Sequence, residues 1–148
     1  NDAQLAAEHL SKHLKDGSWL ATRDAGVLAY FVGVKIRVAE LHNRALTRPH
    51  LDGSGADVTK YTPLNPELII TTVARKTASE FRYSNDRVIF KRTTVPYEYL
   101  GRVEQHYHRY YDIYAREDAQ IPALDPALII NKAGPKPKKH KRKKKMGQ

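Results

Sequence analysis

The sequence contains no cysteine among its 148 residues. This absence excludes disulfide bonds, cysteine nucleophiles and every cysteine-ligated metal site. The sequence also has no run of 18 or more apolar residues, so it predicts no transmembrane helix. A chain of this length is expected to form one domain, or one domain with a tail.

Motifs that carry enzyme chemistry are also missing. We find no glycine-rich phosphate loop, no nucleophile elbow and no paired-carboxylate motif. The run Asp52-Gly53-Ser54-Gly55 indicates a flexible loop and nothing more specific. The sequence therefore favours a protein that is not an enzyme.

The seven histidines do not form a metal-binding pattern. His9 and His13 are four residues apart in a segment expected to be helical, which is a chelating spacing, but no third ligand is indicated. His106 and His108 are two apart and would diverge on a helix. We therefore expect structural or surface histidines, and we predict no metal and no cofactor.

What the chain has in excess is positive charge at one end. It carries 26 Lys and Arg against 16 Asp and Glu, a formal net charge of +10. Nine of those basic residues and none of the acids lie in residues 132–148, so residues 1–131 are close to neutral. The sequence thus predicts a small folded domain over residues 1–131 and a disordered Lys/Arg-rich tail over residues 132–148.

The tail predicts binding to a polyanion, and RNA is the partner we expect. Each phosphate that a cation neutralises releases condensed counterions, which favours binding at low salt. A localisation signal and a merely solubilising tail are the alternatives. The expected RNA-binding residues of the tail are Lys136, Lys138, Lys139, His140, Lys141, Arg142, Lys143, Lys144 and Lys145.

Hydrophobic periodicity predicts the α+β class, with two long amphipathic helices flanking a small antiparallel sheet. Asn1 or Asp2 is expected to cap a first helix through about Leu14. The remaining expected elements are a long helix over residues 24–48, a loop over 48–66, strands over 67–74, through 81–83 and over 87–92 after a turn at 84–86, a second long helix over 94–116, and a short helix over 127–132.

The second long helix is also a candidate binding element, because six of the nine tyrosines lie between Tyr97 and Tyr114. Aromatic and Arg side chains stack on unpaired bases. A helical period directs Tyr114 to the core and leaves Arg109 and Tyr111 on other faces, so these two are further candidate RNA-binding residues. The alternative interpretation is an amphipathic helix that only packs against the core.

Three short segments resemble a known family. Residues 84–89 (SNDRVI), residues 95–98 (VPYE) and the earlier residues 67–70 (ELII) are similar to the core pattern of a mitochondrial ribosomal protein of the large subunit, the forty-two type. The spacing from the strand to the proline differs, and the N-terminal helical segments have no counterpart. The resemblance implies a structural role in binding rRNA beside neighbouring ribosomal proteins.

The sequence as a whole fits the broader class of imported organellar ribosomal proteins. A near-neutral domain, a long loop, a basic extension and a first residue, Asn1, that is not Met are expected of a processed protein of that class. We therefore expect a structural component of a ribonucleoprotein, in the mitochondrion, with no membrane or small-molecule partner. The alternatives are a nuclear DNA- or RNA-binding protein and a protein–protein adaptor.

Overall fold

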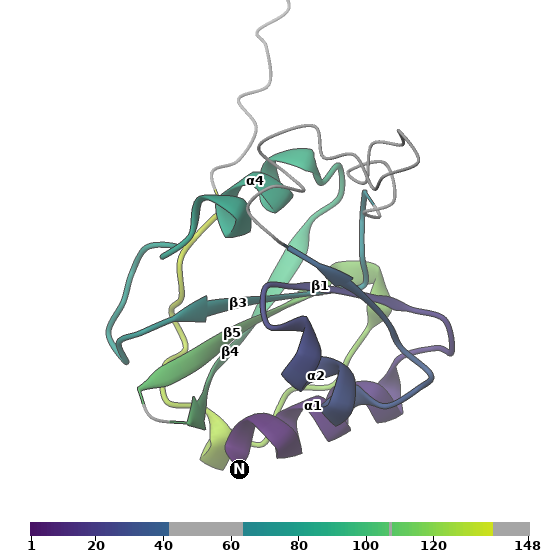
Figure 1. Cartoon of the computed structure of the whole chain (residues 1–148), viewed down its shortest axis with the longest axis horizontal. Helices are drawn as coiled ribbons and strands as arrows, with labels where there is room; N and C mark the ends of the chain where they lie inside the picture. Colours follow the sequence, from purple (N-terminus) through teal and green to yellow (C-terminus); the bar gives the residue numbers. More distant parts are fainter. Residues whose placement is uncertain (42–63, 107, 138–148) are drawn as a thin grey trace, which may run out of the picture.

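The computed structural model describes residues 1–41, 64–106 and 108–137 (Figure 1). Within these ranges the chain forms an α+β fold around a five-stranded mixed sheet. The elements are α1 (Asp2–His13), β1 (Trp19–Thr22), α2 (Ala25–Val32), β2 (Arg37–Glu40), β3 (Leu68–Val73), α4 (Ser84–Arg92), β4 (Tyr97–His106), β5 (Arg109–Arg116) and the 3-10 turns η2 (Glu117–Ala119) and η3 (Pro126–Leu128). The predicted α+β class is confirmed.

Helix α1 matches the first predicted helix. The Asn1 side chain accepts hydrogen bonds from the backbone N–H groups of Ala3 and Gln4, which satisfies donors that have no partner inside a helix. Ala3, Ala6, Ala7 and Leu10 are buried on one side of the helix. The three alanines let the helix pack closely against the sheet, and Leu10 fills the core between them.

The long helix predicted over residues 24–48 is wrong within the described residues. Helix α2 ends at Gly33, whose φ of +78° lies in the left-handed region that terminates helices. The chain then turns back into strand β2, and Val34, which the helical stripe placed in the core, is fully exposed. Residues 42–63 lie outside the described ranges, and they include most of the predicted loop.

The sheet has the order β2-β1-β3-β5-β4 and is mixed, whereas the sequence predicted an antiparallel one. Strand β1 runs parallel to both β2 and β3, and β5 runs antiparallel to β3 and β4. The predicted strand over residues 67–74 is confirmed as β3, whose β-branched run is buried on both faces at the centre of the sheet.

The segment predicted as a turn and a strand over residues 84–92 is instead helix α4. Asp86 lies in its first turn and Lys91 and Arg92 in its last, which complements the helix dipole. Ile89 and Phe90 are buried together on the side facing the sheet. Residues 81–83, also predicted as strand, form an irregular connection into this helix.

The second predicted long helix, residues 94–116, is a β-hairpin of β4 and β5. Its turn contains His108 with a φ of +62°. Residues 110–115 are buried without interruption, because β5 lies between β3 and β4 and is covered on both faces. The spacing of three and four residues therefore does not correspond to a helix face.

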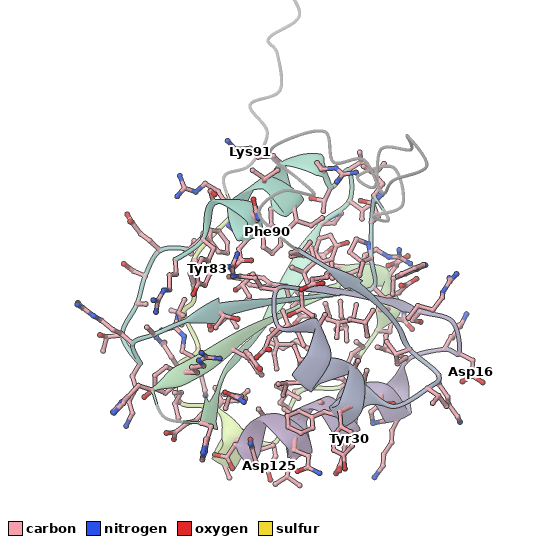
Figure 2. The ribbon with its side chains drawn as sticks, in the orientation of Figure 1. Asp16, Tyr30, Tyr83, Phe90, Lys91 and Asp125 are labelled. Carbon is pink, nitrogen blue, oxygen red and sulfur yellow. The ribbon has the colours of Figure 1, made fainter. Side chains whose placement is uncertain are left out.

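Each face of the sheet is covered by helices (Figure 1). One core cluster joins α1 and α2 to residues such as Leu68 and Ile113. The other joins α4 to Ile69 and Tyr114. In Figure 2, Phe90 points from α4 toward the sheet and Lys91 points away from it.

The C-terminal part of the chain returns across the hairpin. The predicted helix over residues 127–132 is only the 3-10 turn η3, which Asp125 caps through the backbone N–H of Ala127. Asn131 then forms a bridge with Arg102 of β4. The Tyr114 hydroxyl donates a hydrogen bond of 2.5 Å to the carbonyl of Pro135, which is itself buried. Residues 132–137 thus lie on the folded body.

Candidate nucleic-acid interface and arginine pocket

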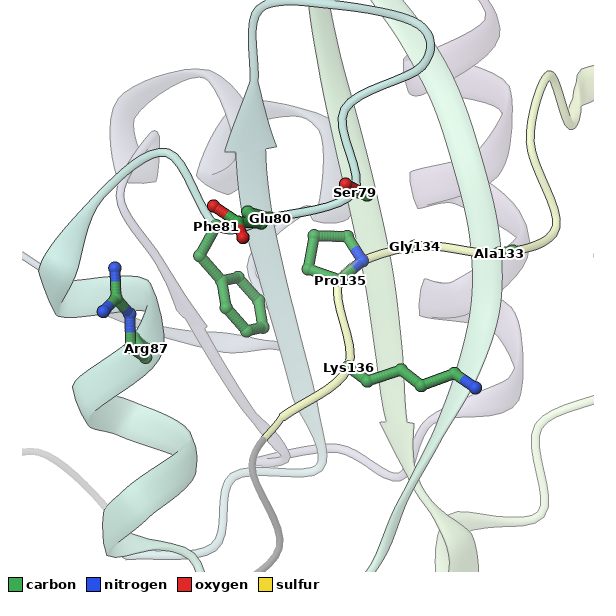
Figure 3. A pocket seen from close by; sticks show the side chains of 8 residues that line it. All are labelled: Ser79, Glu80, Phe81, Arg87, Ala133, Gly134, Pro135 and Lys136. Carbon is green, nitrogen blue, oxygen red and sulfur yellow. The ribbon is translucent and has the colours of Figure 1, made fainter.

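The start of the basic tail lies against the connection that leads into α4. A cavity of about 540 Å³ separates residues 79–81 from residues 133–136, and we call it the C-terminal cavity (Figure 3). It is lined by Ser79, Glu80, Phe81, Arg87, Ala133, Gly134, Pro135 and Lys136.

The cations of this region are exposed and spread out. Figure 3 shows Arg87 and Lys136 on opposite sides of the C-terminal cavity, with Glu80 between them. Lys91 of α4 and Lys132 are also exposed. The cations are too dispersed to surround a single anion, and their spacing is compatible with an extended polyanion. Lys138, Lys139, His140, Lys141, Arg142, Lys143, Lys144 and Lys145 lie outside the described residues.

A second hollow, of about 270 Å³, lies at the carboxyl ends of the parallel strands β1 and β3. We call it the arginine pocket, and it is lined by Arg23, Asp24, Thr72, Val73, Arg82, Tyr83 and Arg109. The Arg23 guanidinium stacks over the Tyr83 ring, with its carbon 3.7 Å from the ring centre, and the guanidinium carbon of Arg82 lies 5.3 Å from the same centre. Cations over an aromatic face are attracted by its electron density.

The two RNA-binding candidates from the hairpin differ in accessibility. Arg109 is exposed and lines the arginine pocket. Tyr111 is 1% exposed, so its ring is not available for base stacking, and the prediction that it faces outward is wrong because β5 is an interior strand. Its hydroxyl donates a hydrogen bond to the Asp24 carboxylate. Burial, followed by that hydrogen bond, raises the pKa of Tyr111.

A buried ion pair that the sequence did not predict holds the connection between β3 and α4. The guanidinium of Arg102, fully buried, forms two hydrogen bonds of 2.8 Å to the carboxylate of Asp112. Its remaining donors bind the backbone carbonyls of Arg75, Lys76 and Ala78. Because the Arg102 guanidinium is hydrogen-bonded to both the Asp112 carboxylate and these carbonyls, it holds the beginning of the connection, residues 74–83, in place. The same connection carries Arg82 and Tyr83.

Asp86 is a second charged group that the sequence analysis missed. It is fully buried between α4 and β3, and its Oδ1 has no hydrogen-bond partner among the described residues. Burial raises the pKa of Asp86 to about 7, an effect that the Thr72 backbone N–H and the charge of Arg23 partly offset. The carboxyl is therefore largely protonated in mildly acidic solution.

Comparison with known proteins gives no relative. No protein-family profile, no curated protein and no solved structure matches the chain.

The described residues contain neither a cluster of metal ligands nor a membrane-spanning helix. No group of three or more potential metal ligands gathers in the described ranges. No helix in this part of the chain is long and apolar enough to cross a membrane.

Proposed function

We propose that this protein binds RNA through its C-terminal Lys/Arg segment and the cations beside it on α4. The observation that carries the proposal is the attachment of residues 132–137 to the body, through the Tyr114 hydroxyl and the buried Pro135. The segment that follows contains most of the excess positive charge. Lys136, close to the end of the described residues, lines the C-terminal cavity together with Arg87.

The expected contacts are with phosphates and not with bases. Tyr111 is buried, and the Tyr83 ring is covered on one face by Arg23. Tyr111 therefore takes no part in base stacking and Tyr83 has one ring face occupied, while the lysines of the segment neutralise phosphates irrespective of sequence. We expect binding that depends weakly on RNA sequence and strongly on salt.

The experiment is a salt titration of binding to a fluorescent single-stranded RNA, followed by anisotropy. If about eight charges engage the strand, the slope of log K against log salt is roughly −6. A variant with every Lys and Arg of residues 136–145 changed to Gln is expected to remove most of that slope, leaving only the contribution of the cations on α4. Lys12→Gln combined with Lys15→Gln, two exposed lysines of the N-terminal region, is the matched control and should bind as the wild type does. An unchanged slope in the tail variant would refute the proposal.

The ribonucleoprotein setting is a further part of the proposal. Sedimentation of native extract through a gradient at moderate and then high salt tests it, because a ribosomal component migrates with a subunit at moderate salt. Deletion of residues 136–145 separates the alternatives. A ribosomal protein loses assembly, a nuclear protein loses localisation, and an adaptor retains its partner.

A further inference from the structure

We propose that the arginine pocket is a binding site for a phosphate monoester group. This site is separate from the tail and does not depend on the RNA-binding proposal. The pocket brings Arg23, Arg82 and Arg109 together from three segments that are far apart in the sequence. Guanidinium groups are the side chains best suited to phosphate, because their planar donor pairs match two phosphate oxygens.

The position of the pocket in the fold is one where ligands commonly bind. Strand β1 leads into α2, which covers one face of the sheet, while β3 leads toward α4 on the opposite face. The two connections therefore diverge between adjacent parallel strands and leave a crevice at their carboxyl ends. Arg23 and Asp24 follow β1 directly, and Thr72 and Val73 end β3.

The charge of the pocket matches a monoester better than a diester. The lining holds three arginines and one carboxylate, Asp24, which is a formal net charge of +2. A phosphate monoester carries about −1.5 to −2 at pH 7, whereas an internal diester carries −1. Asp86 is not part of the lining but accepts a hydrogen bond from the backbone N–H of Thr72, and its raised pKa limits the negative charge that it adds.

The pocket is preorganised on several sides. The Tyr83 ring holds the Arg23 guanidinium by stacking, and the Asp24 carboxylate is held by the Tyr111 hydroxyl. Arg82 and Arg109 form no ion pair within the described ranges, so no acid there occupies their donors. A site whose groups are already ordered loses less entropy when a ligand binds.

The start of α2 adds to the attraction. Asp24 precedes the helix, but its side chain makes no capping hydrogen bond. A Cβ added at Gly26 would meet no atom of the described residues within 4 Å, so none of them covers this position of the first turn. The positive end of the helix dipole thus lies beside the three arginines. The hollow is smaller than typical drug-sized sites, so it suits the phosphate and the first atoms of its carrier.

The test is a titration of the full chain with inorganic phosphate and with phenyl phosphate, observed in ¹H–¹⁵N spectra at constant ionic strength. Saturable shifts are expected at residues 23–26, 72–73, 82–83 and 109. The double variant Arg82→Gln/Arg109→Gln should weaken binding by about tenfold or more, since each loses hydrogen bonds to a charged group. Arg75→Gln, an exposed arginine outside the pocket, is the matched control and should bind normally.

Dimethyl phosphate, a phosphate diester, is titrated for comparison and should bind more weakly than phenyl phosphate, the monoester. Shifts no larger than those caused by chloride, shifts confined to residues 132–148, or equal binding of the diester would overturn the proposal. An RNA with and without a 5′-phosphate identifies the source of the group. A gain from the 5′-phosphate that the double variant loses assigns the site to RNA ends, and no gain assigns it to a small phosphorylated molecule. Neither result depends on the tail.

Discussion

Replacing Asp86 by Asn should stabilise the protein at alkaline pH. The carboxyl is buried, one of its oxygens has no partner in the described part of the chain, and burial raises its pKa from 3.8 to about 7. Ionising this group in the folded state therefore costs free energy that the unfolded chain does not require. Asn has nearly the same shape and never ionises, so it removes that cost.

The pKa shift sets both the size and the pH window of the effect. Below about pH 3 the carboxyl is protonated in both states, and the Asp86→Asn variant and the wild type should be equally stable. As pH rises from 4 to 7 the unfolded state releases its proton first, so the wild type loses stability relative to the variant. The difference of about three pKa units corresponds to about 4 kcal/mol above pH 8, as an upper bound.

The assay is urea unfolding of both proteins at pH 4.5, 6 and 8, with the free energy of unfolding compared at each pH. Asp16→Asn is the control, because Asp16 is exposed and its replacement should shift stability little at any pH. The gap between Asp86→Asn and the wild type should widen steadily with pH. A gap that stays constant with pH, or a variant that is less stable at pH 8, would refute the reasoning by showing that the carboxylate is well solvated or paired.

Three other substitutions test the contacts that position the two sites. Asp112→Asn leaves the buried Arg102 charge without its partner and should reduce the free energy of unfolding by about 3–5 kcal/mol in urea titrations; a loss under 1 kcal/mol would contradict this. Tyr111→Phe removes the hydrogen bond to Asp24 and should cost about 1–2 kcal/mol, with thermal unfolding as the measurement and an unchanged midpoint as the contrary result. Gly134→Ala places a methyl group 2.5 Å from the neighbouring tyrosine ring. It should therefore release residues 132–137 from the body, as increased amide exchange there would show and normal protection would disprove.

Local patterns predicted the fold where local interactions determine it. The first helix follows from the Asn1 cap and from leucines at helical spacing, and β3 follows from a β-branched run. Leu10 and Leu14 are buried as that spacing indicates, whereas Leu5 is 52% exposed and small alanines take its place in the core. In these segments propensity and tertiary packing agree, so the sequence alone is sufficient.

The second predicted long helix was wrong because a strand that is buried on both faces shows no hydrophobic period of its own. Residues 110–115 are buried continuously, so any spacing of large side chains within them can imitate a helix. In the earlier case Gly33 adopts a φ of +78°, which other residues rarely take, and ends α2, although the apolar spacing continues beyond it. Neither outcome follows from periodicity, because both depend on strands from distant parts of the chain.

The candidate sites were predicted only in part for a similar reason. Excess charge in residues 132–148 is visible without a structure, and so is the basic character of Arg109. Arg102 and Asp86, in contrast, have side chains that are usually exposed, and only the pairing of distant strands shows that they are buried. The arginine pocket likewise requires the carboxyl ends of β1 and β3 to be adjacent, which no single segment encodes.

The connection between β3 and α4 links the two sites physically. Its first residues bind the Arg102 guanidinium through backbone carbonyls. Its next residues, 79–81, line the C-terminal cavity, and its last two, Arg82 and Tyr83, line the arginine pocket. One irregular segment therefore supplies side chains to both hollows, and the buried pair of Arg102 with Asp112 sets its position. This arrangement explains why a charged pair is placed in the interior, since an apolar pair would supply no donors to hold the carbonyls of a connection that lacks regular secondary structure.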